Sequence, residues 1–159
     1  MESYIVIDGW KSNVRFSSAH IIPEYEKCGR LHGHSYAVHV KIVGELDKKG
    51  IIFDFTQVKH IIKQIADGLD HKILIPEKSN IAKIGKQGKN VKIVFLEKEY
   101  VFPVEDCIFL PINSTSAENL AGYILDVFLK KIKLSKNIKL VEIGVDEGYG
   151  QGARISKKF

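Results

Sequence analysis

The alternation of side chains between His32 and Ile42 most constrains the fold of this chain. Every second residue from Tyr36 to Ile42 is aromatic or aliphatic, and the same parity continues back through His34 to His32. Side chains alternate between the two faces of a strand, so these positions share one face. The sequence therefore predicts a strand whose buried face begins with two imidazoles, whereas His39 has the opposite parity and lies on the other face.

A third histidine, His20, precedes this strand in the run Phe-Ser-Ser-Ala-His. Three protein ligands with an open fourth position are typical of catalytic zinc sites, while structural zinc sites have four ligands and often several cysteines. His20, His32 and His34 are therefore candidate ligands of a zinc ion. The alternative is that they are ordinary hydrogen-bonded residues, which is the interpretation we give to His39 and His60.

Cys28 lies four residues before His32, in a turn that contains Gly29 and Arg30. Arg30 or a bound cation would favour the thiolate there, which makes Cys28 a candidate base. A free cysteine is more commonly a small buried hydrophobe, and this is our expectation for Cys107.

Asp70 and His71 follow directly after a predicted helix. A carboxylate that orients an imidazole could relay protons for Cys28. The alternative is that Asp70 is a turn residue and that His71 adds a favourable charge at the end of the helix.

Glu147 ends an apolar strand immediately before a glycine-rich stretch. A carboxylate at this point could accept two parallel hydrogen bonds from the amidine-like edge of a heterocycle, and an ordinary solvated strand end is the alternative. The glycines at 148, 150 and 152 indicate a hairpin turn, because no helix follows them as in a phosphate-binding loop.

Periodicity predicts the remaining elements in the order ββααββ. A bulged or kinked strand runs to His20, a second strand ends near Gly44, and a helix capped by Asp54 ends at Gly68. A capping box at Thr115-Ser116-Ala117-Glu118 predicts a second helix and accounts for Glu118. Strands follow at 140–147 and 153–156, and the apolar runs 91–96 and 100–104 predict a β-hairpin within an insert at 76–113. This order indicates an α+β fold with both helices on one face of an antiparallel sheet.

The 159 residues, of which 45% are apolar and 27% charged, fit a single domain over 1–159. No apolar run reaches the length of a membrane span, and Met1 to Trp10 lacks the pattern of a signal peptide. Two dissimilar cysteines favour a reducing cytoplasm over a disulfide framework. The net charge of +5 comes from scattered lysines, which argues against nucleic-acid binding and is compatible with an anionic small substrate.

Together these motifs resemble the 6-pyruvoyltetrahydropterin synthase and 6-carboxytetrahydropterin synthase family. The resemblance is carried, in chain order, by Phe16-Ser-Ser-Ala-His20, Cys28-x-x-x-His32-Gly-His34, Phe53-Asp-Phe55, Leu69-Asp70-His71, Thr115-Ser-Ala-Glu-Asn119 and Glu147. It implies the tunnelling fold, in which the sheets of several copies join into a barrel and two trimers pair into a homohexamer. Shorter relatives pass almost directly from the Asp-His pair to the second helix, whereas this chain has the insert at 76–113.

The resemblance also implies a reaction. It implies zinc on His20, His32 and His34, Cys28 as a base assisted by Asp70 and His71, and a pterin ring anchored by Glu147 with help near Ser116. The substrate of the family is 7,8-dihydroneopterin triphosphate. The run Cys-Gly-Arg-Leu-His-Gly-His looks like the branch that forms 6-carboxytetrahydropterin and acetaldehyde for deazaguanine synthesis. The alternatives are the 6-pyruvoyl product and, in another class, a noncatalytic pterin-binding or metal-binding assembly protein.

Overall fold

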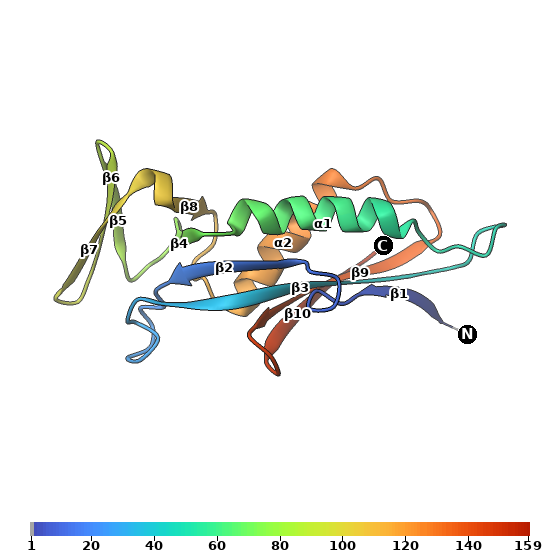
Figure 1. Ribbon diagram of the computed structural model, residues 1–159, viewed down its shortest axis with the longest axis horizontal. Coiled ribbons are helices and arrows are strands. Elements are labelled where there is room, and N and C mark those ends of the chain that lie inside the picture. The colour runs from blue at the N-terminus through green and yellow to red at the C-terminus, as the bar shows by residue number, and fades with distance from the viewer. Residues whose placement is uncertain (1) are drawn as a thin grey trace.

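Two helices lie along one face of a seven-stranded main sheet (Figure 1). The computed structural model describes residues 2–159. The strands of the main sheet are β1 (Ser3–Ile7), β2 (Arg15–His20), β3 (His32–Gly44), β4 (Lys72–Pro76), β8 (Cys107–Leu110), β9 (Ile138–Glu147) and β10 (Gly152–Lys158). Their order is β10-β9-β3-β2-β4-β8, and β1 also pairs with β3. The predicted α+β class is confirmed, and the sheet of one chain is open.

The strand predicted to run to His20 is divided into β1 and β2. Both pair antiparallel with β3, β1 near Gly44 and β2 near His32, so they lie along the same edge of that strand. Residues 8–14 leave the edge between them as a large bulge. Gly9 returns so close to the backbone of Val38 that a Cβ atom would overlap it, which requires glycine there.

The first helix, α1 (Phe55–Leu69), begins as predicted. The carboxylate of Asp54 accepts a hydrogen bond from the amide of Thr56, and the apolar side chains face the core. The second helix, α2 (Ala117–Lys131), begins at Ser116, whose hydroxyl accepts from the amide of Asn119. The predicted capping box is therefore wrong, because Ser116 rather than Thr115 is the N-cap. Neither helix of residues 2–159 is long and apolar enough to cross a bilayer.

Part of the predicted insert belongs to the main sheet. β4 pairs in parallel with β2 on one side and with β8 on the other. Parallel neighbours need a crossover connection, and residues 77–106 provide it between β4 and β8. This segment, hereafter the insert, forms a separate sheet from β5 (Lys83–Gln87), β6 (Asn90–Phe95) and β7 (Lys98–Pro103), followed by the 3₁₀ turn η1 (Val104–Asp106). β6 and β7 form the predicted hairpin, and β5 adds a third strand.

The turn between β9 and β10 is a hairpin turn, as the glycines indicate. Gly148 and Gly150 have φ angles of 80° and 88°, in the left-handed region that glycine adopts without strain. The amide of Gly148 donates to the carbonyl of Ser35, which ties the turn to β3. Glu147 is thereby held at the end of β9, opposite Tyr36.

The face of the main sheet opposite the helices carries a partly buried polar cluster around the buried Asp146. Arg154 donates to Oδ1 at 2.7 Å, and Trp10 Nε1 donates to Oδ2 at 3.0 Å. Nε2 of His39 lies 2.8 Å from Oδ2, and Nδ1 of His39 accepts from the amide of Gly9. His39 thus lies on the face predicted from its parity, where this cluster fastens the bulge at 8–14 to β9 and β10.

Asp146→Asn is expected to lower the free energy of unfolding by about 2 kcal/mol, the scale of hydrogen bonds to a buried charge. Burial acts to raise the pKa of Asp146, but the bonds from Arg154 and Trp10 and the nearby His39 outweigh it, so the pKa is lowered. The stabilisation is therefore present above the ordinary pKa and is lost as the pH falls through the lowered value. Denaturant titration at several pH values measures both effects. The control, Asp126→Asn on the exposed side of α2, should change little.

Candidate active site

Antiparallel pairing of β2 and β3 brings three histidines together. His20 is directly opposite His32 in the register, and His34 projects from the same face two residues further along β3. Their candidate ligand nitrogens all lie within 4.8 Å of one another. His20 is fully buried, while His32 and His34 are partly exposed at the edge of the core.

The hydrogen bonds of two of these imidazoles fix their tautomers. Nδ1 of His20 lies 3.0 Å from the carbonyl oxygen of Thr115, and Nδ1 of His32 lies 2.6 Å from that of Arg30. A carbonyl only accepts, so both Nδ1 atoms carry the proton and both Nε2 atoms carry a lone pair. These Nε2 atoms lie 3.1 Å apart. Two lone pairs that face each other at this distance repel unless a cation or a proton lies between them.

The surroundings of His20 and His34 favour their neutral forms by lowering their pKa values. Burial lowers the pKa of His20 to about 4, and the proximity of His32 and His34 contributes, although the bond to Thr115 opposes the shift. Burial also lowers the pKa of His34, against the opposing effect of the Glu147 carboxylate. Neutral imidazoles are the form that binds a metal ion.

The donor set fits a zinc ion. Zinc–nitrogen bonds of about 2.0–2.1 Å in a tetrahedron place neighbouring nitrogens roughly 3.3 Å apart, close to the separation of the two Nε2 atoms. Among residues 2–159 the cluster offers three ligand side chains. Three imidazoles leave one tetrahedral position open, as in a catalytic site.

Thr115 is a functional residue that the sequence analysis missed. It is fully buried, and both its carbonyl oxygen and Oγ1 lie within 3.1 Å of Nδ1 of His20. Residues in this position orient a ligand imidazole and raise its basicity. The adjacent pair Thr115-Ser116 offers two possible caps, and only packing shows that Ser116 caps α2 while Thr115 contacts the histidine.

Thr115→Val is expected to weaken zinc binding by about tenfold. The substitution removes Oγ1 and keeps the carbonyl, so the effect should lie at the low end of the 10- to 100-fold range for residues that support metal ligands. A competition titration with a chromophoric chelator measures the affinity. Thr115→Ser, which retains the hydroxyl, is the matched control, and equal affinity in Thr115→Val would exclude a role for Oγ1.

Cys28, Ser116 and Glu147 line one cavity of about 330 Å³. Cys28 comes from the loop between β2 and β3, Ser116 from the start of α2, and Glu147 from the end of β9. Glu118 lines the same cavity, so the sequence analysis was incomplete in assigning it to helix capping alone. The structure therefore gathers the candidate base and both candidate substrate-binding residues around one space.

Glu147 connects this cavity to the histidines. Its Oε2 lies 4.0 Å from Nε2 of His34. Its Oε1 is buried, and among the described residues it has no hydrogen-bond partner. Burying a carboxylate oxygen without a donor is costly, so this atom is placed to accept a hydrogen bond from a ligand. Tyr36 lies alongside, and burial, with the nearby Glu147, raises the pKa of its hydroxyl.

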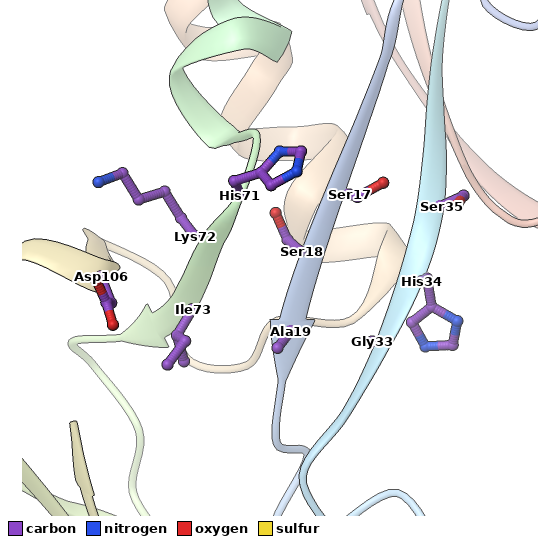
Figure 2. A pocket seen from close by; sticks show the side chains of 10 residues that line it. All are labelled: Ser17, Ser18, Ala19, Gly33, His34, Ser35, His71, Lys72, Ile73 and Asp106. Carbon is purple, nitrogen blue, oxygen red and sulfur yellow. The ribbon is translucent and has the colours of Figure 1, made fainter. Parts of the chain in front are cut away.

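Asp70 and His71 lie at a different place. Oδ2 of Asp70 is 2.8 Å from Nδ1 of His71, and the amide of Ser17 donates to Oδ1, which lowers the pKa of Asp70. His71 lines a second cavity, of about 700 Å³, together with His34 and other residues of β2, β3 and β4. In Figure 2 the imidazole of His71 lies beside β2, whereas that of His34 lies on the far side of β3. The side chain of His71 is 85% exposed. Within one chain, His71 and Cys28 thus line separate cavities, and Asp70 contacts the imidazole of His71.

Residues 10–158 match the family described as 6-pyruvoyl tetrahydropterin synthase. The chain is 42% identical to a protein of Methanocaldococcus jannaschii provisionally named 6-carboxy-5,6,7,8-tetrahydropterin synthase, over 92% of each chain. It is 30% identical to the 6-carboxy-5,6,7,8-tetrahydropterin synthase of Aquifex aeolicus, over 84% of this chain and 80% of that one. The structure superposes on 6-pyruvoyl tetrahydropterin synthase of Plasmodium falciparum with a TM-score of 0.91 and 31% identity, over 99% of both chains.

Proposed function

This chain belongs to the 6-pyruvoyl tetrahydropterin synthase family, and we propose that it is a zinc-dependent lyase acting on 7,8-dihydroneopterin triphosphate. The observation that carries the proposal is the buried Oε1 of Glu147, which has no hydrogen-bond partner among residues 2–159. Glu147 lines the cavity of Cys28 and lies beside the histidine cluster. The proposed product is 6-carboxy-5,6,7,8-tetrahydropterin, with release of acetaldehyde and triphosphate, on the route to deazaguanine nucleosides. The two free cysteines agree with a cytoplasmic enzyme.

Glu147 is the proposed anchor of the pterin ring. The ring has an amidine-like edge with adjacent N–H donors, and a carboxylate can accept two such bonds in parallel. This pairing would satisfy Oε1 of Glu147, to which no group of the described residues donates. Ser116 lies on the wall of the same cavity, where its hydroxyl already caps α2 and can also face the ring.

His20, His32 and His34 are the proposed zinc ligands. When bound, zinc supplies a Lewis acid that polarises the side-chain oxygens of the substrate and acidifies the neighbouring C–H groups. Cys28 then removes a proton from the substrate side chain, and its position in the cavity of Glu147 supports that role. General bases of this kind contribute about 10²- to 10⁴-fold to a rate.

Asp70 and His71 are proposed to assist the Cys28 of a neighbouring copy. His71 is too exposed, and the cavity that it lines too open, for a proton relay to operate there without a further covering element. A barrel of several copies, as in the tunnelling fold, would supply that cover. The proposed assembly is a homohexamer, in which each site takes Cys28 from one copy and His71 from the next.

A complementation experiment tests this arrangement. Cys28→Ala and His71→Ala are each expected to lose most of their turnover, and mixed oligomers reassembled from both should regain activity, because some interfaces then combine two intact residues. Oligomers reassembled from each variant alone are the controls. If mixed oligomers of verified composition stay as inactive as either parent, Asp70 and His71 do not act across an interface.

The product distinguishes the two candidate reactions. The Cys28-x-x-x-His32 run and the name of the M. jannaschii relative favour the 6-carboxy product. The likeness to the P. falciparum protein favours the alternative, in which elimination of triphosphate stops at 6-pyruvoyltetrahydropterin. Mass spectrometry of the pterin formed from dihydroneopterin triphosphate, with an assay for acetaldehyde, decides between them. Binding without any turnover by the zinc-loaded protein would instead indicate a noncatalytic pterin-binding protein.

A further inference from the structure

The insert has an apolar cluster of its own, separate from the core between the helices and the main sheet. The buried members that come from the insert itself are Ala82, Val91, Ile93 and Phe95. Ile75 and Cys107 join the cluster from β4 and β8, the two strands that the insert connects. The last buried member, Ile21, comes from a distant part of the chain and is 6% exposed.

Ile21 begins the loop that carries Cys28. This segment, residues 21–31, hereafter the Cys28 loop, follows directly after His20. The amide of Ile22 donates to the carbonyl of Cys28 at 2.8 Å, and the amide of Gly29 donates to that of Tyr25 at 2.8 Å. The loop is therefore internally closed, and the backbone next to Ile21 is hydrogen-bonded directly to the backbone of Cys28.

The connection between the insert and the Cys28 loop runs through the base of the loop. Ile21 and Pro23 line a small apolar gap together with Ile84 and Ile93 of the insert. The turn between β6 and β7 does not close on the loop, because a cavity of about 570 Å³ lies between that turn and residues such as Tyr25 and Arg30. The insert can therefore influence the Cys28 loop through packing at Ile21, rather than through contact at the turn between β6 and β7.

The far side of the Cys28 loop faces the proposed active site. Tyr25 lines both the cavity next to the insert and the cavity of Cys28 and Glu147, so the loop forms the wall between them. Arg30 belongs to the same wall, and its carbonyl oxygen holds the imidazole of His32. The position of the Cys28 thiol relative to Glu147 and the histidines therefore depends on the position of this loop.

We propose that the insert is a positioning element for the catalytic loop, with Ile93 and Ile21 as the positioning residues that set the place of Cys28. The proposal rests on the proposed function only where it concerns turnover. Among residues 2–159, no hydrogen bond or ion pair joins the insert to a proposed metal-binding or substrate-binding residue, although Asp106 lines the cavity of His34 and His71. The role of the insert is to hold the Cys28 loop from the side that faces away from the proposed active site, so that Cys28 has one position relative to the substrate.

The test compares Ile93→Ala with Ile124→Ala. Both positions are buried aliphatic residues, Ile93 in the cluster of the insert and Ile124 in the main core, so both variants should lose thermal stability. Only Ile93→Ala is expected to speed deuterium uptake in peptides of residues 22–31 and to change the alkylation rate of Cys28 by iodoacetamide, read by peptide mass spectrometry. Its kcat should fall by about 10²-fold, the cost of a misplacement of about 1 Å, with a smaller change in KM and unchanged zinc content.

Two further variants serve as a rescue and as a control for Ile93→Ala. Ile93→Val should restore the loop readouts and kcat toward wild type, and it replaces Ile93→Ala as the probe if that variant does not fold. Val101→Ala, at an exposed position of β7, should leave all readouts unchanged. Faster exchange in β6 together with wild-type exchange in residues 22–31 and wild-type alkylation of Cys28 would overturn the proposal. A wild-type protein without pterin turnover would refute the proposed function alone, since the loop readouts need no substrate.

Discussion

Cys28→Ala is expected to lower turnover by about 10²- to 10⁴-fold, the contribution of a general base. The variant should keep its zinc, because the three histidines, Thr115 and the pairing of β2 with β3 are untouched. It should also keep its oligomeric state. Steady-state kinetics, elemental analysis and light scattering measure the three quantities on one preparation.

The matched control for Cys28→Ala is Lys27→Ala. Lys27 is the exposed preceding residue of the same loop, and only its backbone carbonyl takes part in a hydrogen bond, to the amide of Arg30. Its substitution should leave turnover within about twofold of wild type, as is usual for exposed positions. Turnover near the wild-type rate in Cys28→Ala would exclude the thiol as the base and would direct attention to Glu118, another ionisable side chain that lines the cavity of Cys28.

His32→Ala is expected to abolish zinc binding at micromolar protein concentration. The substitution removes one of three ligands and leaves two imidazoles, which is fewer than the three protein ligands of catalytic zinc sites. Elemental analysis after dialysis should give less than about a tenth of the wild-type zinc content. His60→Ala, at an exposed position on α1, removes an imidazole from elsewhere and should retain full zinc content. Undiminished zinc in His32→Ala would exclude this ligand set.

Acidification should release the same ion without mutation. In the folded chain the pKa of His20 is lowered from 6.5 to about 4, first by burial. Between these two pH values the unfolded chain binds a proton that the folded chain does not, so the free energy of unfolding falls as the pH is lowered through this window. Zinc binding requires the neutral imidazole, so zinc release and loss of stability should occur together. Zinc titrations and thermal melts between pH 7 and roughly pH 4 check this expectation, and zinc retained at pH 4 would contradict it.

Local patterns predicted the parts of the site that depend on neighbouring residues. The parity of His32 and His34 placed them on the core-facing side of β3, and the parity of His39 placed it on the other face. The cap at Asp54 and the glycine turn after Glu147 also followed from nearby residues. These predictions hold because side-chain alternation and capping depend on a few successive residues.

Nonlocal packing decided what the patterns could not. Thr115 and Ser116 are both good caps, and the burial of Thr115 against His20 selects Ser116. The third strand of the insert has no alternating apolar pattern of its own, since β5 (Lys83–Gln87) has only Ile84 as an apolar side chain, and it forms by pairing with β6. The residues next to Ile21 in the sequence do not indicate that its side chain belongs to the apolar cluster of the insert.

The sequence by itself determined the family, the candidate metal ligands and the face of the strand on which two of these histidines lie. Only the tertiary structure decided that His20 lies opposite His32 with the Nε2 lone pairs facing, and that His71 lines another cavity than Cys28. It also decided that Glu147 has a buried oxygen without a donor among residues 2–159. The physical reason is that residue spacing fixes direction along one strand or helix. Strand register and the burial of an individual oxygen depend instead on segments tens to more than a hundred residues apart, which meet only when the sheet and helices pack.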